Sequence, residues 1–366
     1  MKINVLDLFS GIGGFSQGLK QAGFDIENHY YSEIDKHAQA IYKKQFPTAK
    51  AIGDVRHVRG SELGRINAIT FGSPCQDFSL AGKRKGMDGE RSSLITEAIR
   101  LITECKPDFF IWENVKGTFS SNSGADFWAI VKAFANIGGY RIEWQLLNTA
   151  WLLPQNRERI YLVGRLADRC SGQVFPITEN TKRIDERSKQ ATNVRTLTAG
   201  GNSGGLHSSM TLIKSIHGED HEGTIVPYSM GSGKKGRSCI GAQRVPEIGD
   251  ENHSIRRLTE IECERLQGFK DDWTRLGLYP ETLFVKYIYK KRRQKAANDP
   301  KKARNKQIPL YRSEGLILRM LVVLYNKNRV VKKEVSASQR YKCLGNAVTV
   351  DVVQAVGERI LRGFES

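Results

Sequence analysis

The sequence predicts an α/β protein with a doubly wound, mainly parallel sheet and a smaller, irregular, β-rich domain. Two observations carry this prediction. In the first 115 residues, short runs of β-forming residues alternate with amphipathic stretches of about a dozen residues, as in βαβ units. After about residue 165 the chain becomes polar and glycine-rich and loses helical spacing, so short strands and loops are expected there.

The first half of the chain contains the predicted sheet. Residues 3–9, INVLDLF, end at the glycine-rich turn SGIGG, and the stretch FSQGLKQAG follows with helical spacing. The same succession returns at HYYSEID and DKHAQAIYKKQF, while INAITFG at 66–72 and PDFFIWENV at 107–115 predict further strands. Two strand-like stretches around Pro154, within 141–164, predict an antiparallel pair at the far edge of the sheet.

The second half regains helical spacing at 256–269, where Thr259 as N-cap and Glu262 three residues later predict a capping box. A closing amphipathic helix is predicted over 345–363, entered from a glycine turn. Between them lies a basic segment with one apolar run, 315–325, which is too hydrophobic for a disordered tail.

The charge of the chain points to a polyanionic partner. There are 57 Lys and Arg against 39 Asp and Glu, a net charge of +18. Residues 281–335 contain 16 Lys or Arg and 4 Asp or Glu, so their surplus of +12 is two thirds of the total. A solvated or disordered basic segment is the alternative explanation for such a run.

Other classes of protein are disfavoured. No stretch approaches the roughly 18 apolar residues of a membrane span, and the N-terminus lacks a cleavable signal pattern, so a cytoplasmic location is expected. The six cysteines are far apart, with no C-x-x-C pair and no histidine cluster at ligand spacing. We therefore expect neither disulfides nor a metal site, and a functional cysteine would act as a thiol.

The turn after the first strand is a candidate cofactor site. FSGIGG lets the backbone approach a ligand and presents the N-terminus of a helix, but it lacks the third glycine of the dinucleotide fingerprint, and a purely structural turn is the alternative. Glu33 follows about twenty residues later, where a carboxylate would bind ribose hydroxyls. A surface charge is the ordinary role for such a glutamate. Asp54 follows a third strand-like run and could accept an adenine amino group.

A second group of residues suggests covalent chemistry. Cys75 lies in the loop GSPCQDFSLAG at the end of a strand, where a thiolate could reach a substrate, although a buried core cysteine is the alternative. Glu113 ends the next strand beside a tryptophan, which favours a raised pKa and a proton to donate, unless it forms a structural ion pair. Arg157 and Arg159 alternate on a predicted strand and could hold a carbonyl or phosphate, or form surface salt bridges.

The order of these motifs resembles that of the cytosine-5 DNA methyltransferases of prokaryotic or phage type. The blocks are FSGIGG, the run at Glu33, GDV, GSPCQDFS, ENV, QNRERIYLVG, RRLTEIECERLQGF and QRYKCLGNAV. They cover roughly residues 3–164, 256–269 and 339–360, well over half of the chain. The resemblance implies a Rossmann-like methyltransferase fold and S-adenosylmethionine as cofactor, which accounts for the missing third glycine.

The resemblance also implies a reaction. Its substrate would be C5 of a cytosine in a specific duplex DNA sequence, reached by base flipping. Cys75 would add to cytosine C6, and Glu113 would protonate or hydrogen-bond N3. Arg159 would hold the cytosine O2, with Arg157 as its neighbour. The cofactor pocket carried over from the family comprises Phe9, Gly11, Gly13, Glu33, Ile34, Asp54, Pro74, Asn346 and Val348.

Because Asn346 belongs to the C-terminal block, its helix would fold back on the N-terminal half. We therefore predict a discontinuous catalytic domain, residues 1–165 plus 339–366, and a target-recognition domain, 166–338. The basic insertion at 281–335 departs from the family pattern, and we expect phosphate contacts from Lys290, Lys291, Arg292 and Arg293.

Some alternatives stay open on the sequence alone. The same blocks occur in a branch that methylates tRNA cytosine, and a non-catalytic DNA-binding relative is a further candidate. Such a relative would be expected to lose Cys75 or Glu113, and both are present. The expected partner is double-stranded DNA, without a membrane or a metal, and the expected state is a monomer that serves restriction-modification or a phage.

Overall fold

The computed structural model describes residues 1–73, 94–178, 194–198, 212–216, 227–228, 253–287 and 320–365. The chain divides into two compact units. The first comprises Met1–Gly277 with Glu334–Ser366, and the second comprises Leu278–Lys333. The predicted domain borders near 165 and 339 are not tested by this division and stay predictions.

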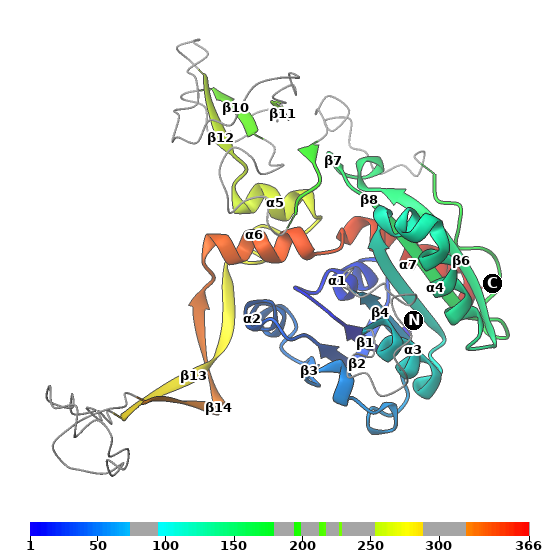
Figure 1. The fold of residues 1–366 in the computed structure, drawn as a ribbon, viewed down its shortest axis with the longest axis horizontal. Helices are drawn as coiled ribbons and strands as arrows, with labels where there is room; N and C mark the ends of the chain where they lie inside the picture. The colour runs from blue at the N-terminus through cyan, green and yellow to red at the C-terminus, as the bar shows by residue number, and fades with distance from the viewer. Residues whose placement is uncertain are drawn as a thin grey trace, which may run out of the picture. The chain divides into compact units, whose positions relative to one another are not determined.

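A seven-stranded sheet forms the centre of the first unit, with strand order β3-β2-β1-β4-β5-β8-β6 (Figure 1). The strands are β1 (Lys2–Leu8), β2 (Asp25–Ser32), β3 (Lys50–Ala51), β4 (Ala68–Gly72), β5 (Phe109–Val115), β6 (Tyr140–Asn148) and β8 (Glu158–Leu166). Pairing is parallel from β3 to β5, whereas β8 is antiparallel to both β5 and β6. The predicted mainly parallel sheet and the antiparallel pair around Pro154 are confirmed.

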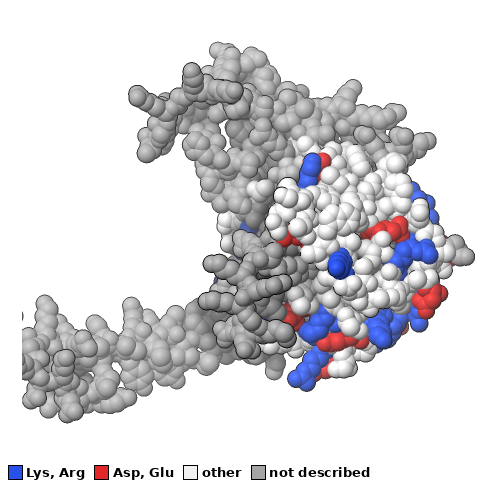
Figure 2. All heavy atoms as spheres, turned by 45° about the vertical axis from the view of Figure 1, so that its right-hand side comes forward, with Lys and Arg blue, Asp and Glu red and all other residues white. Residues whose placement is uncertain are grey.

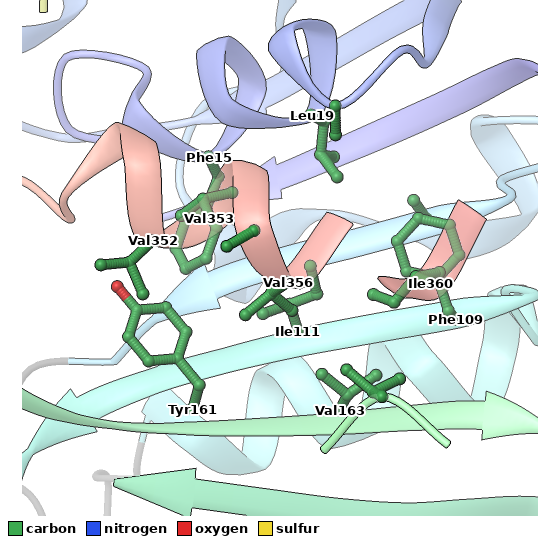
Figure 3. Packing of buried hydrophobic residues seen from close by; sticks show 14 of the residues in the cluster. Phe15, Leu19, Phe109, Ile111, Tyr161, Val163, Val352, Val353, Val356 and Ile360 are labelled. Carbon is green, nitrogen blue, oxygen red and sulfur yellow. The ribbon is translucent and has the colours of Figure 1, made fainter. Parts of the chain in front are cut away.

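Helices cover both faces of this sheet. On one face lie α1 (Gly14–Gln21) and α7 (Val350–Glu365), and on the other lie α3 (Leu94–Cys105) and α4 (Ala125–Ala135). Side chains along a strand alternate between the faces. In β5, Phe109 and Ile111 therefore join the α1 and α7 cluster (Figure 3), while Phe110 and Trp112 pack toward α3 and α4. The sheet is thus buried on both faces, as expected of a doubly wound fold.

The C-terminal helix packs closely on the first helix. A Cβ atom at Gly18 would lie 2.6 Å from Val353 of α7, so only glycine permits this separation of the two helices. Phe15, Leu19 and Val356 fill the contact between these helices and the sheet (Figure 3). The two ends of the chain therefore share one hydrophobic core.

The first unit contains further helices, strands and turns. They are α2 (Lys36–Gln45), α5 (Glu260–Leu266), α6 (Ala337–Asn346), β7 (Gln155–Asn156), β9 (Val194–Arg195), β10 (Leu212–Ile216), β11 (Pro227–Tyr228), β12 (His253–Arg257), and the 3₁₀ turns η1 (Val55–His57), η2 (Gly60–Glu62), η4 (Lys116–Phe119), η5 (Ser121–Gly124) and η6 (Thr149–Trp151). The predicted capping box is confirmed at α5, where the N–H of Thr259 donates to Glu262 and the N–H of Glu262 donates to the Thr259 hydroxyl.

The C-terminal prediction was wrong in one respect. The closing helix expected over 345–363 is α7, but it begins only at Val350, and residues 345–346 form the end of α6. The chain is extended at Ala347, between them, with φ −72° and ψ 148°. Gln267 stabilises this break, because its side-chain amide donates to Leu344 O at 2.9 Å and its backbone carbonyl accepts from Val350 N at 2.9 Å.

In its described part the second unit consists of a two-stranded sheet. Its strands are β13 (Leu276–Tyr287) and β14 (Met320–Glu334), which begin and end at the border with the first unit. Of the apolar run 315–325, residues 320–325 belong to β14 and the rest lies outside the described residues. Among the described residues of both units, no helix is long and apolar enough to cross a membrane.

Candidate active site

The sheet brings four predicted site segments to one edge. The turn at Phe9 follows β1, Glu33 follows β2, Ser73 follows β4, and Glu113 lies near the end of β5. Because these four strands run parallel, their carboxyl ends meet. The chain leaves β1 for β2 on one side and returns to β4 on the other, and doubly wound folds bind ligands at such a switch point.

The turn from β1 to α1 has an unusual backbone. Phe9, Gly11 and Gly13 adopt positive φ values of 50°, 54° and 91°. The N–H of Gly13 donates to Ser10 O at 3.0 Å, while the buried Ser10 hydroxyl has no hydrogen-bond partner among the described residues. An unpaired buried hydroxyl in such a turn fits a ligand that would supply the missing partner.

Glu33 is tied directly to this turn. One carboxylate oxygen accepts from Gly11 N at 2.8 Å, and the other accepts from Asp35 N at 2.8 Å. The neighbouring Ile34 side chain is 77% exposed. A carboxylate beside an exposed apolar side chain suits a nucleoside, which presents both hydroxyls and a flat ring.

Asp54 lies three residues after β3 and caps η1. Its carboxylate accepts from Arg56 N at 3.0 Å and pairs with the Arg56 guanidinium, and these hydrogen bonds lower the pKa of Asp54 to about 2. The group is therefore an ionised acceptor across the physiological range, as recognition of an amino group requires.

The C-terminal block meets the turn from the other side. Val348 is buried and leaves no room for a side chain at Gly14, where a Cβ would lie 2.7 Å from its methyl group. Asn346 ends α6 and is exposed. The indole N–H of Trp273 donates to Ile12 O at 3.0 Å, so the segment after α5 also supports the turn.

Glu113 and Arg159 form a pair on adjacent strands. Glu113 Oε1 lies 3.2 Å from Arg159 Nε, and the glutamate is only 9% exposed. Burial raises the pKa of Glu113, although Arg159 and Arg157 oppose the shift. Gly72 lies opposite Glu113 in the sheet, and a Cβ there would come within 3.0 Å of the carboxylate. The geometry favours a carboxyl group that can hold a proton.

Arg157 makes different contacts from those of Arg159. It is 3% exposed and donates to three backbone carbonyls, Leu197 O at 2.9 Å, Ala347 O at 2.8 Å and Gly345 O at 3.4 Å. Burial lowers its pKa to about 10. The guanidinium thus ties the start of β8 to the C-terminal block, which the strand alternation in the sequence did not indicate.

A buried polar cluster beneath the turn was missed by the sequence analysis. Asp7 accepts from Ser16 at 2.9 Å, Tyr42 at 3.0 Å and Thr70 at 3.0 Å, and His29 Nε2 lies 2.7 Å from the Tyr42 hydroxyl. Burial raises the pKa of Asp7 to about 7, and burial lowers that of His29 to about 4. In the sequence, the only sign of this cluster is one acid, Asp7, inside an apolar strand.

Asp7→Asn should become increasingly stabilising, relative to the wild type, as the pH rises from 4 to 7. The pKa of Asp7 in the folded protein, about 7, exceeds its ordinary value of 3.8, so the native state binds this proton more tightly than the unfolded state does. The resulting contribution to the free energy of unfolding is lost as the pH rises. The maximum slope is about 1.4 kcal/mol per pH unit. Urea unfolding of both proteins at several pH values measures it. A pH-independent difference would contradict the prediction.

Several predicted site residues lie outside the described residues, namely Pro74, Cys75, Lys290, Lys291, Arg292 and Arg293. Their predicted roles stay predictions. Within the described ranges, no group of three or more His, Cys, Asp or Glu side chains could hold a metal ion.

Comparison with protein families gives one match over most of the chain. A family model described as C-5 cytosine-specific DNA methylase matches residues 3–284. The type II methyltransferase M.Bsp6I of Bacillus sp. strain RFL6 is 31% identical over 306 residues, covering 77% of this chain and 92% of that protein. The orphan methyltransferase M.SPRI of Bacillus phage SPR is 35% identical over 192 residues, 52% of this chain and 44% of that protein. The match thus spans less than half the length of the phage protein.

Two solved structures are similar along nearly the whole chain. Dnmt2 methyltransferase of S. pombe has a TM-score of 0.57 at 15% identity, covering 99% of both chains. EhMeth of Entamoeba histolytica has a TM-score of 0.59 at 16% identity, covering 99% of this chain and 98% of that one. At these identities the likeness concerns the fold alone.

Proposed function

This chain belongs to the C-5 cytosine-specific DNA methylase family, and on that premise we propose that it methylates C5 of a cytosine within a specific sequence of duplex DNA. The family and the enzyme class, DNA (cytosine-5-)-methyltransferase, agree with the prediction from the motifs. The proposal concerns the finer points, which are the cofactor, the flipped base and the covalent intermediate.

One observation carries the proposed chemistry. Glu113 and Gly72 face each other across β5 and β4, and Cys75 follows Gly72 by three residues. A nucleophile and a proton donor from adjacent strand ends can therefore act on one base. Cytosine C5 is a poor nucleophile, and addition of the Cys75 thiolate to C6 would convert the ring into an enamine that reacts at C5.

The proton-donating role of Glu113 follows from its surroundings. A raised pKa keeps a proton available for cytosine N3, where negative charge develops during thiolate addition. Arg159, 3.2 Å from Glu113, would donate to cytosine O2 and hold the glutamate in place. The target base must leave the stack to reach these groups, at a cost of about a few kcal/mol.

S-adenosylmethionine fits the residues beside the turn. The Glu33 carboxylate would hold the ribose hydroxyls, Ile34 would cover the adenine, and Asp54 would accept from its amino group. The unpaired Ser10 hydroxyl gives independent support for a polar ligand here. When bound, this cofactor supplies the electrophilic methyl group that C5 accepts. Phe9, the backbone at Gly11 and Gly13, Pro74, Asn346 and Val348 would complete the pocket.

We assign Arg157 a positioning role in this proposal. Its guanidinium is engaged with the carbonyls of Leu197, Gly345 and Ala347, so it serves the substrate only by fixing neighbouring segments. We therefore no longer assign Arg157 to the cytosine O2, where the sequence placed it beside Arg159.

The proposal is tested by expressing the protein in a host without cytosine methylation and sequencing the DNA after bisulfite conversion. We expect 5-methylcytosine at one short recognition sequence. Purified protein with labelled cofactor should label duplex DNA and leave tRNA unlabelled. Labelling of tRNA alone would support the RNA methyltransferase alternative, and labelling of neither would support a non-catalytic relative.

The basic insertion should supply phosphate contacts. On the face shown in Figure 2, positive and negative groups of the described residues are interspersed, whereas 281–335 alone has a surplus of +12. Replacing Lys290, Lys291, Arg292 and Arg293 with alanine should weaken binding to all DNA sequences about equally. The slope of log K against log salt should become shallower by about 0.9 per lost contact, or by as much as about 3.6.

Affinity at three salt concentrations, together with the methylation pattern, measures this effect. The recognition sequence should survive, because phosphate contacts position a protein and base contacts specify the sequence. An unchanged slope would rule out the phosphate contacts, and altered methylation sites would show that the insertion contacts bases.

A further inference from the structure

Ser73 occupies a buried position between the two strands that carry the proposed chemistry. It directly follows β4 and precedes Cys75 by two residues. Its hydroxyl accepts from the indole N–H of Trp112 at 3.0 Å and lies 3.3 Å from Asn114 Nδ2. The Ser73 carbonyl also accepts from Asn114 Nδ2, at 3.3 Å. One short side chain thus contacts both neighbours of Glu113.

These contacts are firmly held on the β5 side. Trp112 is completely buried among the residues that pack against α3 and α4. Asn114 is also buried, and its Oδ1 accepts from Val115 N at 2.7 Å and from the Thr118 hydroxyl at 3.3 Å. The donors that reach Ser73 are therefore fixed by packing and by further hydrogen bonds.

We propose that the Ser73 hydroxyl is a positioning group that fixes the start of the Cys75 loop against the strand carrying Glu113. The inference rests on the proposed function, because it concerns the same nucleophile and the same proton donor. Addition to C6 and protonation at N3 require both groups to reach one ring. A misplacement of about 1 Å can cost about 100-fold in rate, so an anchor two residues from the nucleophile has kinetic consequences.

The test uses four single variants and the double mutant that combines Ser73→Ala with Trp112→Phe. Ser73→Ala removes the acceptor, and Trp112→Phe removes the indole donor while keeping an aromatic ring. Ser73→Thr keeps the hydroxyl and serves as the rescue variant. Tyr140→Phe is the matched control, because it deletes one hydrogen bond, from the Tyr140 hydroxyl to Pro107 O at 2.8 Å, beyond the opposite end of β5.

The measured quantity is the rate of covalent capture by duplex DNA carrying 5-fluorocytosine at the mapped target, with saturating DNA and cofactor. Ser73→Ala and Trp112→Phe should each slow capture by about 10- to 100-fold. The Kd values for DNA and cofactor should change by less than about twofold. The double mutant should be no slower than the slower single variant, because both delete the same contact. Ser73→Thr should restore most of the rate, and Tyr140→Phe should retain it.

Other results overturn the proposal. Capture rates in Ser73→Ala and Trp112→Phe equal to that of Tyr140→Phe, after correction for the folded fraction, would show a merely structural contact. Fully additive losses in the double mutant would show that the two side chains act separately. Either of these two results, obtained with a wild-type protein that is captured normally, overturns the positioning role and leaves the proposed covalent mechanism in place. If the wild-type protein is not captured at all, the proposed covalent mechanism is overturned, and the positioning role with it.

Discussion

Cys75→Ser should abolish methyl transfer, with a loss of at least about 1,000-fold, and leave cofactor affinity nearly unchanged. The serine hydroxyl is a far weaker nucleophile toward cytosine C6 than a thiolate. Cofactor affinity should persist because Cys75 does not belong to the proposed cofactor pocket, which contains Glu33 and Asp54. Single-turnover methyl transfer to a mapped DNA site measures the loss, and calorimetry measures cofactor binding.

A trapping experiment gives the matched control for this variant. Duplex DNA with 5-fluorocytosine should form a denaturation-resistant adduct with the wild-type protein, because fluorine cannot leave as the C5 proton does. The adduct should map to Cys75 and be absent from Cys75→Ser. Turnover by the variant above a few per cent of wild type would remove Cys75 from the nucleophile role.

The edge of the sheet that carries the site could be predicted from the sequence because its signals are local. Strand ends that precede glycine turns or isolated acids mark Glu33 and Glu113, and parallel pairing then brings those ends together. The burial of Glu113 followed from its position in an apolar strand. Its distance of 3.2 Å to Arg159 depends on the antiparallel register of β5 and β8, which the motifs do not specify.

Contacts between distant segments could not be predicted. The motif QNRERIYLVG singles out Arg157, but only folding places it against Leu197 and Ala347. The break between α6 and α7 was missed for the same reason, since Gln267 stabilises it from about 80 residues away in the chain. The helical periodicity across 345–363 predicted one continuous helix. The break depends on a contact with a distant residue, which a local sequence pattern does not show.

The buried polar groups show a related limit. Asp7 lies inside an apolar strand and Ser73 directly follows one, and the sequence around them does not indicate their partners. Their importance comes from partners such as Tyr42 and Trp112, whose side chains converge only in the folded chain. Buried polar groups require such partners, so each one marks a constraint on the fold.

Glu113→Gln should lower the single-turnover rate by about 100- to 10,000-fold, the usual contribution of a positioned proton donor. Glutamine keeps the shape of the side chain and can still donate a hydrogen bond to N3, but it cannot give up a proton. In the wild type, the rate should rise with pH as the Cys75 thiol ionises and fall again as Glu113 loses its proton. Burial raises the pKa of Glu113, which extends the active range upward in pH. Glu113→Gln should lose the alkaline fall and keep the acidic rise.

The control for this variant is Glu158→Gln, which removes an exposed carboxylate on the neighbouring strand that pairs with Lys116 at 2.8 Å. It should leave the pH profile unchanged, because surface ion pairs contribute little to stability and this one does not involve Glu113. DNA affinity should change little in either variant, since a proton donor acts mainly as the transition state forms. A Glu113→Gln protein with a normal rate but weak DNA binding would contradict the proton-donor role, because the carboxylate would then serve only to hold Arg159 and the base-binding surface in place.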